Sequence, residues 1–406
     1  MTPIERVEEI AFDPSLTVAD RSQSIIQYFS AQGGQGPDRA VDCLLETIDE
    51  AVAEYVAEYL ELVPDVAEGK IRAAERLRGA GPVVRAAGRL VPWLPESLTA
   101  AFVEDYLAAP DPESPLSSVI FNIGVYHPDR LRPYEERLDT PLHRSSLLSG
   151  APDSVADSLL REWRESREMG SLVALALIRT PHAADLITSV RDEVDTPEQW
   201  EVLMPLAGRL PDTGNPAGFH PAFMGFVTDQ GKSPHVMGGR YEQDVPLCAR
   251  CGMPADRVLT LSSRELPYEL GADPSFFWFS CDCDEVDILY VQFAEDGTHA
   301  FYQPQGPSAE KSRVVPGERA MVLETHPNQT GVSRPAVTGR ARHQVGGLPR
   351  WPSPETHALC PGCGNFMPFL VAVDSGPTPF GPLGFEGSLF GFWCDRCSIS
   401  ATRSQP

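Results

Sequence analysis

The sequence predicts a multidomain α+β protein, all helical in its N-terminal part and β-rich in a duplicated zinc-knuckle module that follows. Through the first half, apolar residues recur at three- and four-residue steps, which is the period of an amphipathic helix. Eight of the nine cysteines form two matched sets of four in the last part of the chain. We therefore expect a helical domain at 1–212, a first zinc-knuckle β unit at 213–330 and a second at 331–406.

The clearest helical pattern covers 39–63, which we predict to be one continuous helix ended by Pro64. Cys43 lies near its apolar stripe and is expected in the core. Further helices, several opening on proline, are predicted at 18–31, 67–78, 83–90, 95–107, 114–125, 128–138, 154–167, 171–178, 181–193 and 197–209. Short helices joined by proline turns resemble a HEAT-type α-solenoid, and an irregular helical bundle is the alternative.

A row of acidic residues occupies the polar face of the 39–63 pattern. It could dock a basic partner, but a solvated helix face is the commoner explanation of such a row. Its members are Glu46, Asp49, Glu50, Glu54, Glu58 and Glu61.

Each cysteine set has the spacing of a metal clamp. The first set is Cys248, Cys251, Cys281 and Cys283, and the second is Cys360, Cys363, Cys394 and Cys397. A Cys-x2-Cys turn brings two sulfurs to one side of a tight knuckle, and two facing pairs make the tetrahedral sulfur cage that suits zinc. The pair Cys281-Asp282-Cys283 is one residue tighter than a standard second knuckle, which affects the expected geometry of the first site.

We expect two structural zinc ions, because a cage with four sulfur ligands leaves no open position for water or substrate. Iron in a rubredoxin-like site uses the same ligands and is the chemical alternative. Free or disulfide-bonded thiols are a third possibility. The first residues lack the basic and apolar regions of a secretory signal, so we expect a cytoplasmic protein with reduced thiols.

The two cysteine-bearing halves align with each other. The offset from Cys248 to Cys360 is 112 residues, a His-x-x-Gly-Gly stretch precedes each first pair, and an aromatic run precedes each second pair. We infer a duplication, with each half forming one sheet whose strand ends are held by metal and whose aromatic run packs beside the cage. His235 and His343 are expected to be structural, although a role as extra ligand or base is the alternative. Strands are predicted at 258–261, 276–279, 288–293, 300–302, 366–373 and 388–393.

A family resemblance follows from the stretch His343-Gln344-Val345-Gly346-Gly347-Leu348-Pro349-Arg350-Trp351-Pro352 and the Cys360-Pro361-Gly362-Cys363-Gly364 knuckle after it. Together they resemble the YwqG-like family of uncharacterised bacterial proteins over about 234–406. The first half departs from that pattern, because Gly238-Gly239 is followed by Arg240-Tyr241. The resemblance implies an α+β fold and a bacterial cytoplasmic context, and it implies no reaction and no catalytic residues.

The charge balance narrows the classes of function to be expected. The formal net charge is −24 and the pI about 4.7, which disfavours a nucleic-acid-binding zinc-ribbon protein. No apolar run reaches the length of a membrane span, and no phosphate loop or catalytic motif is recognisable. We expect a zinc-stabilised, non-enzymatic protein-interaction protein, such as an inhibitor or immunity-type binder of a basic partner. An enzyme or enzyme regulator is the alternative. The basic connection 311–350 could dock an acidic partner or the acidic helical domain of the same chain.

Overall fold

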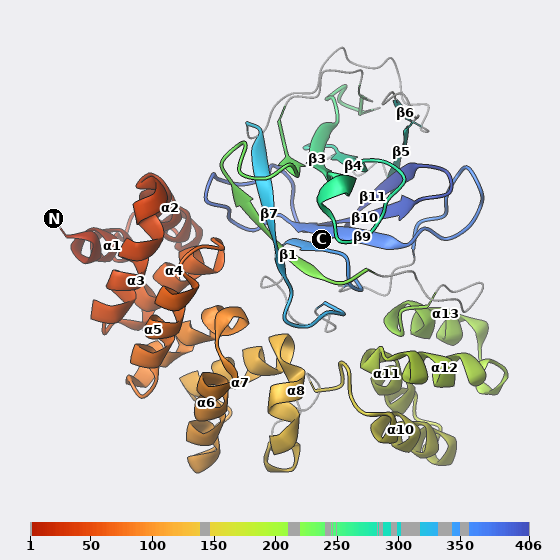
Figure 1. Cartoon of the computed structure of the whole chain (residues 1–406), viewed down its shortest axis with the longest axis horizontal. Coiled ribbons are helices and arrows are strands. Elements are labelled where there is room, and N and C mark those ends of the chain that lie inside the picture. Colours follow the sequence, from red (N-terminus) through yellow and green to blue (C-terminus); the bar gives the residue numbers. More distant parts are fainter. Residues whose placement is uncertain are drawn as a thin grey trace. The chain divides into compact units, whose positions relative to one another are not determined.

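The computed structural model describes residues 2–138, 147–209, 220–239, 245, 247–248, 250–281, 283, 287–293, 299–301, 317–331, 343–349 and 357–405. These residues belong to two compact units, which are described separately (Figure 1). The first unit is Met1–Ala151 with His326–Asn328 and Pro377–Gly381, and the second is Pro152–Thr325, Gln329–Gly376 and Pro382–Pro406. The boundary expected at residue 212 falls outside the described residues, and the predicted domain limits stay predictions.

The first unit is helical in its N-terminal stretch. Helix α1 begins after Thr2 and α2 after Thr17, and each threonine forms a capping box with the acidic residue three positions on. Several neighbouring pairs pack together, among them α1 with α2, α3 with α4 and α6 with α7, and so do α2 with α4 and α3 with α5. The helices of this unit are α1 Pro3–Ala11, α2 Val18–Ser30, η1 Gly33–Gln35, α3 Gly36–Glu46, α4 Glu50–Glu61, α5 Ala67–Leu77, η2 Gly81–Trp93, α6 Glu96–Ala108, α7 Pro115–Tyr126, α8 Pro128–Leu131 and η3 Arg132–Arg137.

The single helix predicted over 39–63 is wrong, because the chain breaks between α3 and α4. Thr47 is extended, with ψ 145°, and the Asp49 carboxylate accepts a hydrogen bond from the Val52 N–H at 3.0 Å. Asp49 is therefore an N-cap that starts a new helix. Ile48, assigned to the apolar stripe, is 86% exposed. Cys43 is confirmed as a core residue, since it is buried.

The acidic row on α4 does not form a solvated face. Arg89 donates to Glu61 at 2.7 Å and to Glu54 at 3.2 Å, and Arg85 pairs with Glu50 at 3.2 Å. Ser22 donates to Glu58 at 2.7 Å. The solvated-face interpretation is therefore wrong for α4, whose carboxylates are bound by residues of η2 and α2, and docking of a basic partner by this row stays a prediction. Glu46, at the end of α3, stays exposed.

The second unit contains four helices and the sheet. The helices are α10 Asp153–Ser166, α11 Met169–Ile178, α12 Pro181–Ser189 and α13 Pro197–Leu206, with the short η4 Arg191–Glu193 between the last two. Arg179, directly after α11, is buried and donates to the carbonyl oxygens of Leu206 at 3.1 Å and Pro349 at 3.2 Å. This side chain fixes the end of α13 to the segment that follows the second Gly-Gly turn.

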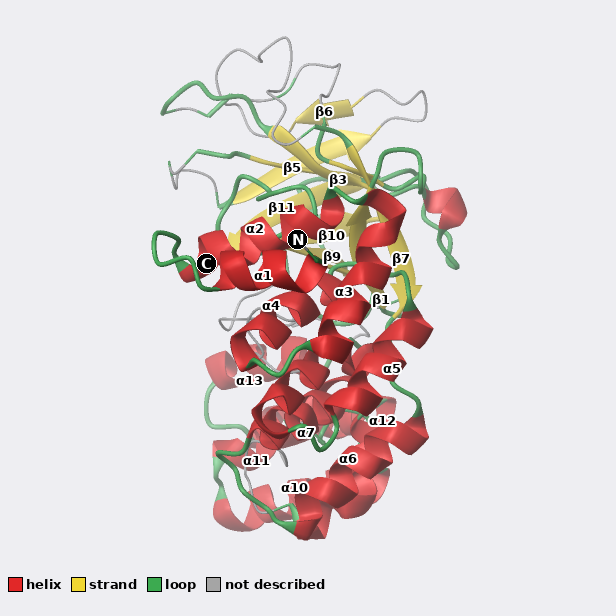
Figure 2. Ribbon diagram, turned by 90° about the vertical axis from the view of Figure 1, so that its left-hand side faces the viewer, coloured by secondary structure: helices red, strands yellow, loops and turns green. Residues whose placement is uncertain are grey.

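The described strands form a single antiparallel sheet (Figures 1 and 2). Its order is β4-β3-β2-β7-β1-β8-β9-β10-β11-β5-β6. The strands are β1 Phe223–Thr228, β2 Val236–Met237, β3 Asp256–Thr260, β4 Ser275–Trp278, β5 Ile288–Phe293, β6 His299–Phe301, β7 Arg319–Thr325, β8 His343–Val345, β9 Phe369–Asp374, β10 Ser388–Cys394 and β11 Ile399–Gln405; η5 Ser263–Glu265 lies between β3 and β4.

The expectation of one sheet for each half is wrong. The antiparallel pair β1–β7 joins the two halves: β2-β3-β4 extends from β7, and β8-β9-β10 extends from β1 and is continued by β11, β5 and β6. Strands of both halves are thus joined in one sheet, with β5 and β6 of the first half beside β11 of the second. Both halves also meet where β4 packs against β11, and the Ser400 hydroxyl there donates to the Ser275 carbonyl at 2.7 Å.

Candidate metal centres

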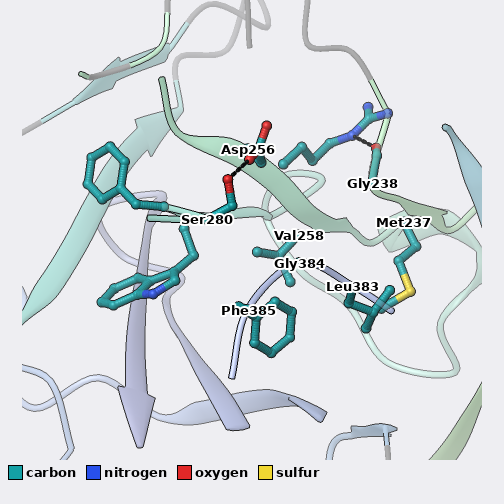
Figure 3. A pocket seen from close by; sticks show the side chains of 11 residues that line it. Met237, Gly238, Asp256, Val258, Ser280, Leu383, Gly384 and Phe385 are labelled. Atoms are coloured by element: carbon teal, nitrogen blue, oxygen red, sulfur yellow. Dashed lines mark hydrogen bonds between the residues drawn. The ribbon is translucent and has the colours of Figure 1, made fainter. Parts of the chain in front are cut away.

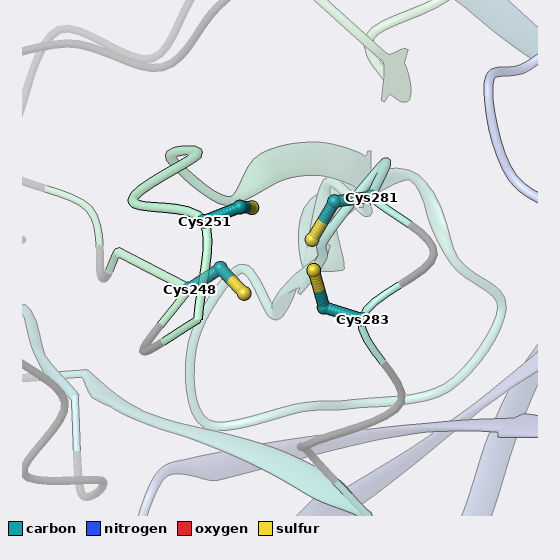
Figure 4. Close-up of side chains that lie close together, drawn as sticks. All are labelled: Cys248, Cys251, Cys281 and Cys283. Carbon is teal, nitrogen blue, oxygen red and sulfur yellow. The ribbon is translucent and has the colours of Figure 1, made fainter.

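The eight cysteines predicted as ligands come together as the two predicted sets. In each set the four Sγ atoms lie within 4.8 Å of one another. We call the group of Cys248, Cys251, Cys281 and Cys283 the first cage (Figure 4) and the group of Cys360, Cys363, Cys394 and Cys397 the second cage. The Sγ atoms of Cys363 and Cys394 are 3.8 Å apart, which matches the edge of about 3.8 Å that a tetrahedron with Zn–S bonds near ~2.3 Å requires.

The first pair of each cage lies in the same kind of knuckle. In each, the first cysteine N–H donates at 2.8 Å to the carbonyl five residues on, and the glycine after the second cysteine donates back at 2.8 Å. That glycine, Gly252 or Gly364, has φ of 71° or 72°, a conformation that favours glycine. Bridges Leu247–Pro254 and Leu359–Phe366 close the two knuckles 112 residues apart, so the duplication is present in three dimensions.

The histidines of the two halves have matching roles. His235 Nδ1 accepts from the Ser262 N–H at 3.0 Å, just after β3, and His343 Nδ1 accepts from the Asp374 N–H at 3.3 Å, at the end of β9. Both rings therefore fasten the start of one strand to the end of the next. Neither ring belongs to a group of possible metal ligands among the described residues, and the two hydrogen bonds agree with the structural interpretation.

The aromatic runs pack beside the cages, as predicted. Phe390 and Phe392 share a buried cluster with Cys360 and Cys394, and Phe277 and Phe279 share one with Cys248. Apolar walls of this kind keep water from the sulfurs. They also raise the free energy of a buried thiolate that has no cation beside it.

The thiols have pKa values that suit metal capture. Burial opposes ionisation of Cys248, but hydrogen bonds from the Cys251 and Arg250 N–H groups lower its pKa to about 7. The Asn365 N–H likewise lowers the pKa of Cys363. Burial raises the pKa of Cys281 and of Cys394 in the opposite pairs. Each cage thus pairs a thiol that ionises readily with one that gives up its proton when a cation arrives.

A shallow pocket lies next to the first cage and is lined in part by Trp278, Phe279 and Ser280, just before Cys281. At one side the Ser280 hydroxyl donates to Asp256 Oδ2 at 2.9 Å, and Leu383, Gly384 and Phe385 lie at another (Figure 3). Among the described lining residues only Asp256 and Arg257 are titratable, and Arg257 is bound to the Gly238 carbonyl and to Glu318. No sequence pattern indicates this pocket, because part of its wall comes from the β9–β10 connection, which is distant in sequence from the rest of the lining.

Several sequence predictions fall outside the described residues. They include Trp351 and most of the basic residues of the connection 311–350. No family model, no curated protein and no solved structure matches the chain. Among the described residues, no helix has both the length and the apolar character needed to cross a membrane.

Proposed function

We propose that the chain is a zinc-stabilised, non-enzymatic protein-interaction protein that binds a basic partner through the acidic surface of α1 and α3. Two zinc ions in the cages would fix the ends of the sheet strands, and the helices would present the binding surface. The observation that carries the proposal is a group of exposed carboxylates for which the described residues offer no ion pair.

The acidic face consists of Glu8 on α1 and Asp38, Asp42 and Glu46 on α3, all exposed. The three residues of α3 are four positions apart, so they lie along one side of that helix. Helix α1 packs against α3. Burial, together with the charges of Glu46, Asp42 and Glu8, raises the pKa of Cys43 to about 12, which places all three carboxylates close to one thiol.

This face differs from the acidic row on α4. There arginine and serine side chains bind the carboxylates, whereas no ion pair to the four residues of the acidic face occurs among the described residues. Residues 1–50 contain ten acidic and three basic residues. Such a surface attracts a basic protein and speeds its association at moderate salt. A nuclease or other nucleic-acid enzyme has the complementary charge, which supports an inhibitor or immunity-type role.

The finer points of fold and family belong to the same proposal. Stacking of helices with their second neighbours supports a HEAT-like solenoid for the first unit. The matched knuckles and the α+β architecture support membership of the YwqG-like family and, with it, a bacterial cytoplasmic setting.

Charge-neutral variants test the acidic face. The triple variant Asp38→Asn, Asp42→Asn, Glu46→Gln removes its main row, and Glu162→Gln, Glu165→Gln, Glu168→Gln removes the same charge from exposed positions at and beyond the end of α10. Tagged chains capture proteins from a lysate of the source organism, which are quantified at low and high salt. We expect basic proteins with the wild type and the α10 control, and at least a tenfold loss with the α3 variant. Equal capture by all three chains would refute the acidic face as the binding surface.

The pocket beside the first cage favours a second function, that of an enzyme or enzyme regulator with a small ligand. The Asp256–Ser280 pair offers a carboxylate and a hydroxyl, but no described lining residue is a histidine or a cysteine that could serve as base or nucleophile. A ligand that protects Trp278 from quenching, and that Asp256→Asn no longer binds, would support this alternative.

A further inference from the structure

We propose that the two cages have different roles: the first is an exchangeable, oxidation-sensitive metal site, and the second holds its metal permanently. This inference rests on the proposed zinc binding and extends it, because duplication would otherwise predict two equivalent structural sites. The two cages differ in three independent features of the described residues.

The first feature is the strand topology around the second pair of ligands. Cys394 is the last residue of β10 and pairs with Ile399, the first residue of β11, so a β-hairpin holds Cys394 and Cys397 in place. Cys281 and Cys283 follow β4, but the next strand, β5, pairs with β11 and β6 and does not pair with β4. Hydrogen bonds preorganise the second cage, whereas metal itself must order the ligands of the first.

The second feature is access to the sulfurs. In the second cage Cys360 and Cys394 are buried, and Cys363 and Cys397 are partly buried. In the first cage only Cys248 is buried, Cys281 and Cys283 are partly buried, and Cys251 is exposed. Oxidation and ligand exchange both follow the exposure of a thiolate, so Cys251 is the sulfur that a dissolved reagent reaches first.

The third feature is the fit of the knuckle against the opposite pair. A Cβ placed on Gly362 would lie 3.1 Å from Cys397 Sγ, so this glycine lets the second knuckle approach its partner pair closely. The residue 112 positions earlier is Arg250, which carries a Cβ and an exposed side chain. The first knuckle therefore lacks the glycine that allows close approach, and its opposite pair is also one residue shorter.

The chemistry of release involves a two-electron peroxide oxidant. The Cys251 thiolate attacks one oxygen of hydrogen peroxide, the O–O bond breaks, and hydroxide leaves, giving a sulfenic acid. A second thiolate of the cage, within 4.8 Å, attacks that sulfur, and a disulfide forms as another hydroxide leaves. Two protons convert the hydroxides to water, two thiolates have lost two electrons to the peroxide, and Zn²⁺ leaves a cage that has lost two ligands. Reduction by a dithiol restores both ligands.

Release would free Cys281 and Cys283 from the metal and alter the neighbouring pocket, which contains Phe279 and Ser280 just before them. The first cage would in this way couple the redox state or zinc supply to the shape of the second unit, while the second cage preserves its fold.

The test follows zinc release from the full chain, loaded with zinc under anaerobic conditions and then exposed to hydrogen peroxide in the presence of a zinc-binding dye. We expect two zinc ions per chain at the start and two phases of release, with the first at least tenfold faster. Peptide mapping after the fast phase should find Cys251 in a disulfide with Cys281 or Cys283. Treatment with dithiothreitol and fresh zinc should restore the second ion.

Matched variants assign the phases. Cys251→Ser should contain one zinc ion and release it slowly. Cys363→Ser should retain the fast phase of zinc release if it folds, and should hold no zinc if it unfolds. Two ions that leave the wild type at one rate, or a fast phase that survives in Cys251→Ser, would overturn the proposed difference. A wild-type chain that binds no metal at all would instead overturn the underlying metal proposal, so the two failures are distinguishable.

Discussion

Replacing Gly391 with alanine should destabilise the sheet by about 1–3 kcal/mol, because this glycine on β10 of the second half lies against Phe276 of the first half. An added Cβ would lie 2.6 Å from two ring carbons of Phe276 on β4 and 2.5 Å from Val371 Cγ2 on β9. Carbon atoms in contact prefer about 3.5–4.0 Å, so the neighbours would have to retreat by about 1 Å. Phe276 and Val371 are each only 1% exposed, and neither can move into solvent.

Gly170 provides the matched control for this substitution. It lies in α11 of the same unit, is exposed, and has no atom within 4 Å of an added Cβ. Alanine there should stabilise the chain by about 0.5–1 kcal/mol, because it reduces the conformational entropy of the unfolded chain and has a higher helix propensity than glycine. Urea unfolding of the zinc-loaded proteins measures both changes. A neutral or stabilising effect of Gly391→Ala would refute the packing of β4 against β10, and Phe276→Leu in the same chain should recover part of the loss.

Two further predictions concern buried charged and titratable groups of the first unit. Arg89→Ala should lower the free energy of unfolding by about 2–4 kcal/mol, since it leaves Glu61, whose side chain is 7% exposed, without its cation; denaturant unfolding checks this, and an unchanged midpoint would contradict it. Burial lowers the pKa of His127 from 6.5 to about 4. Between these pH values His127 is therefore protonated in the unfolded chain and neutral in the folded chain. Stability should therefore fall by up to about 3 kcal/mol as the pH drops through that window. In His127→Gln the melting temperature should depend less on pH between 7 and 5, and an identical dependence would show that this ring contributes nothing.

The two groups of four cysteines could be predicted from the sequence because the chemistry that their spacing indicates is local. A Cys-x2-Cys-Gly knuckle needs only a few consecutive residues, and Gly252 and Gly364 mark the positive φ angles that the turn requires. The predicted strands that became β3, β4, β5, β6, β9 and β10 carry aromatic and β-branched residues, which report directly on a buried strand. Their positions agree with the structure within a few residues.

The remaining strands could not be predicted, because pairing partners distant in sequence decide their structure. Strand β7 has the sequence Arg-Ala-Met-Val-Leu-Glu-Thr, which contains several good helix formers and becomes a strand between β1 and β2. Strand β11 is made largely of Ser, Ala and Thr and gives no apolar alternation, yet most of it is buried. Without β1, β7 and β11 the single shared sheet could not be foreseen.

The acidic row on α4 shows a similar limit. Its spacing correctly identified a polar side of the helix, but the sequence could not show that Arg85 and Arg89 of η2 would bind it. The unbalanced carboxylates lie instead on α1 and α3, where only the packing of separate helices brings them together.

Metal analysis of the purified chain tests the central claim most directly. Inductively coupled plasma mass spectrometry of protein prepared without added metal or chelator should find close to two zinc ions per chain, and one in Cys251→Ser. A chain that is folded by circular dichroism and contains neither zinc nor iron near stoichiometry would contradict the assignment of both cages.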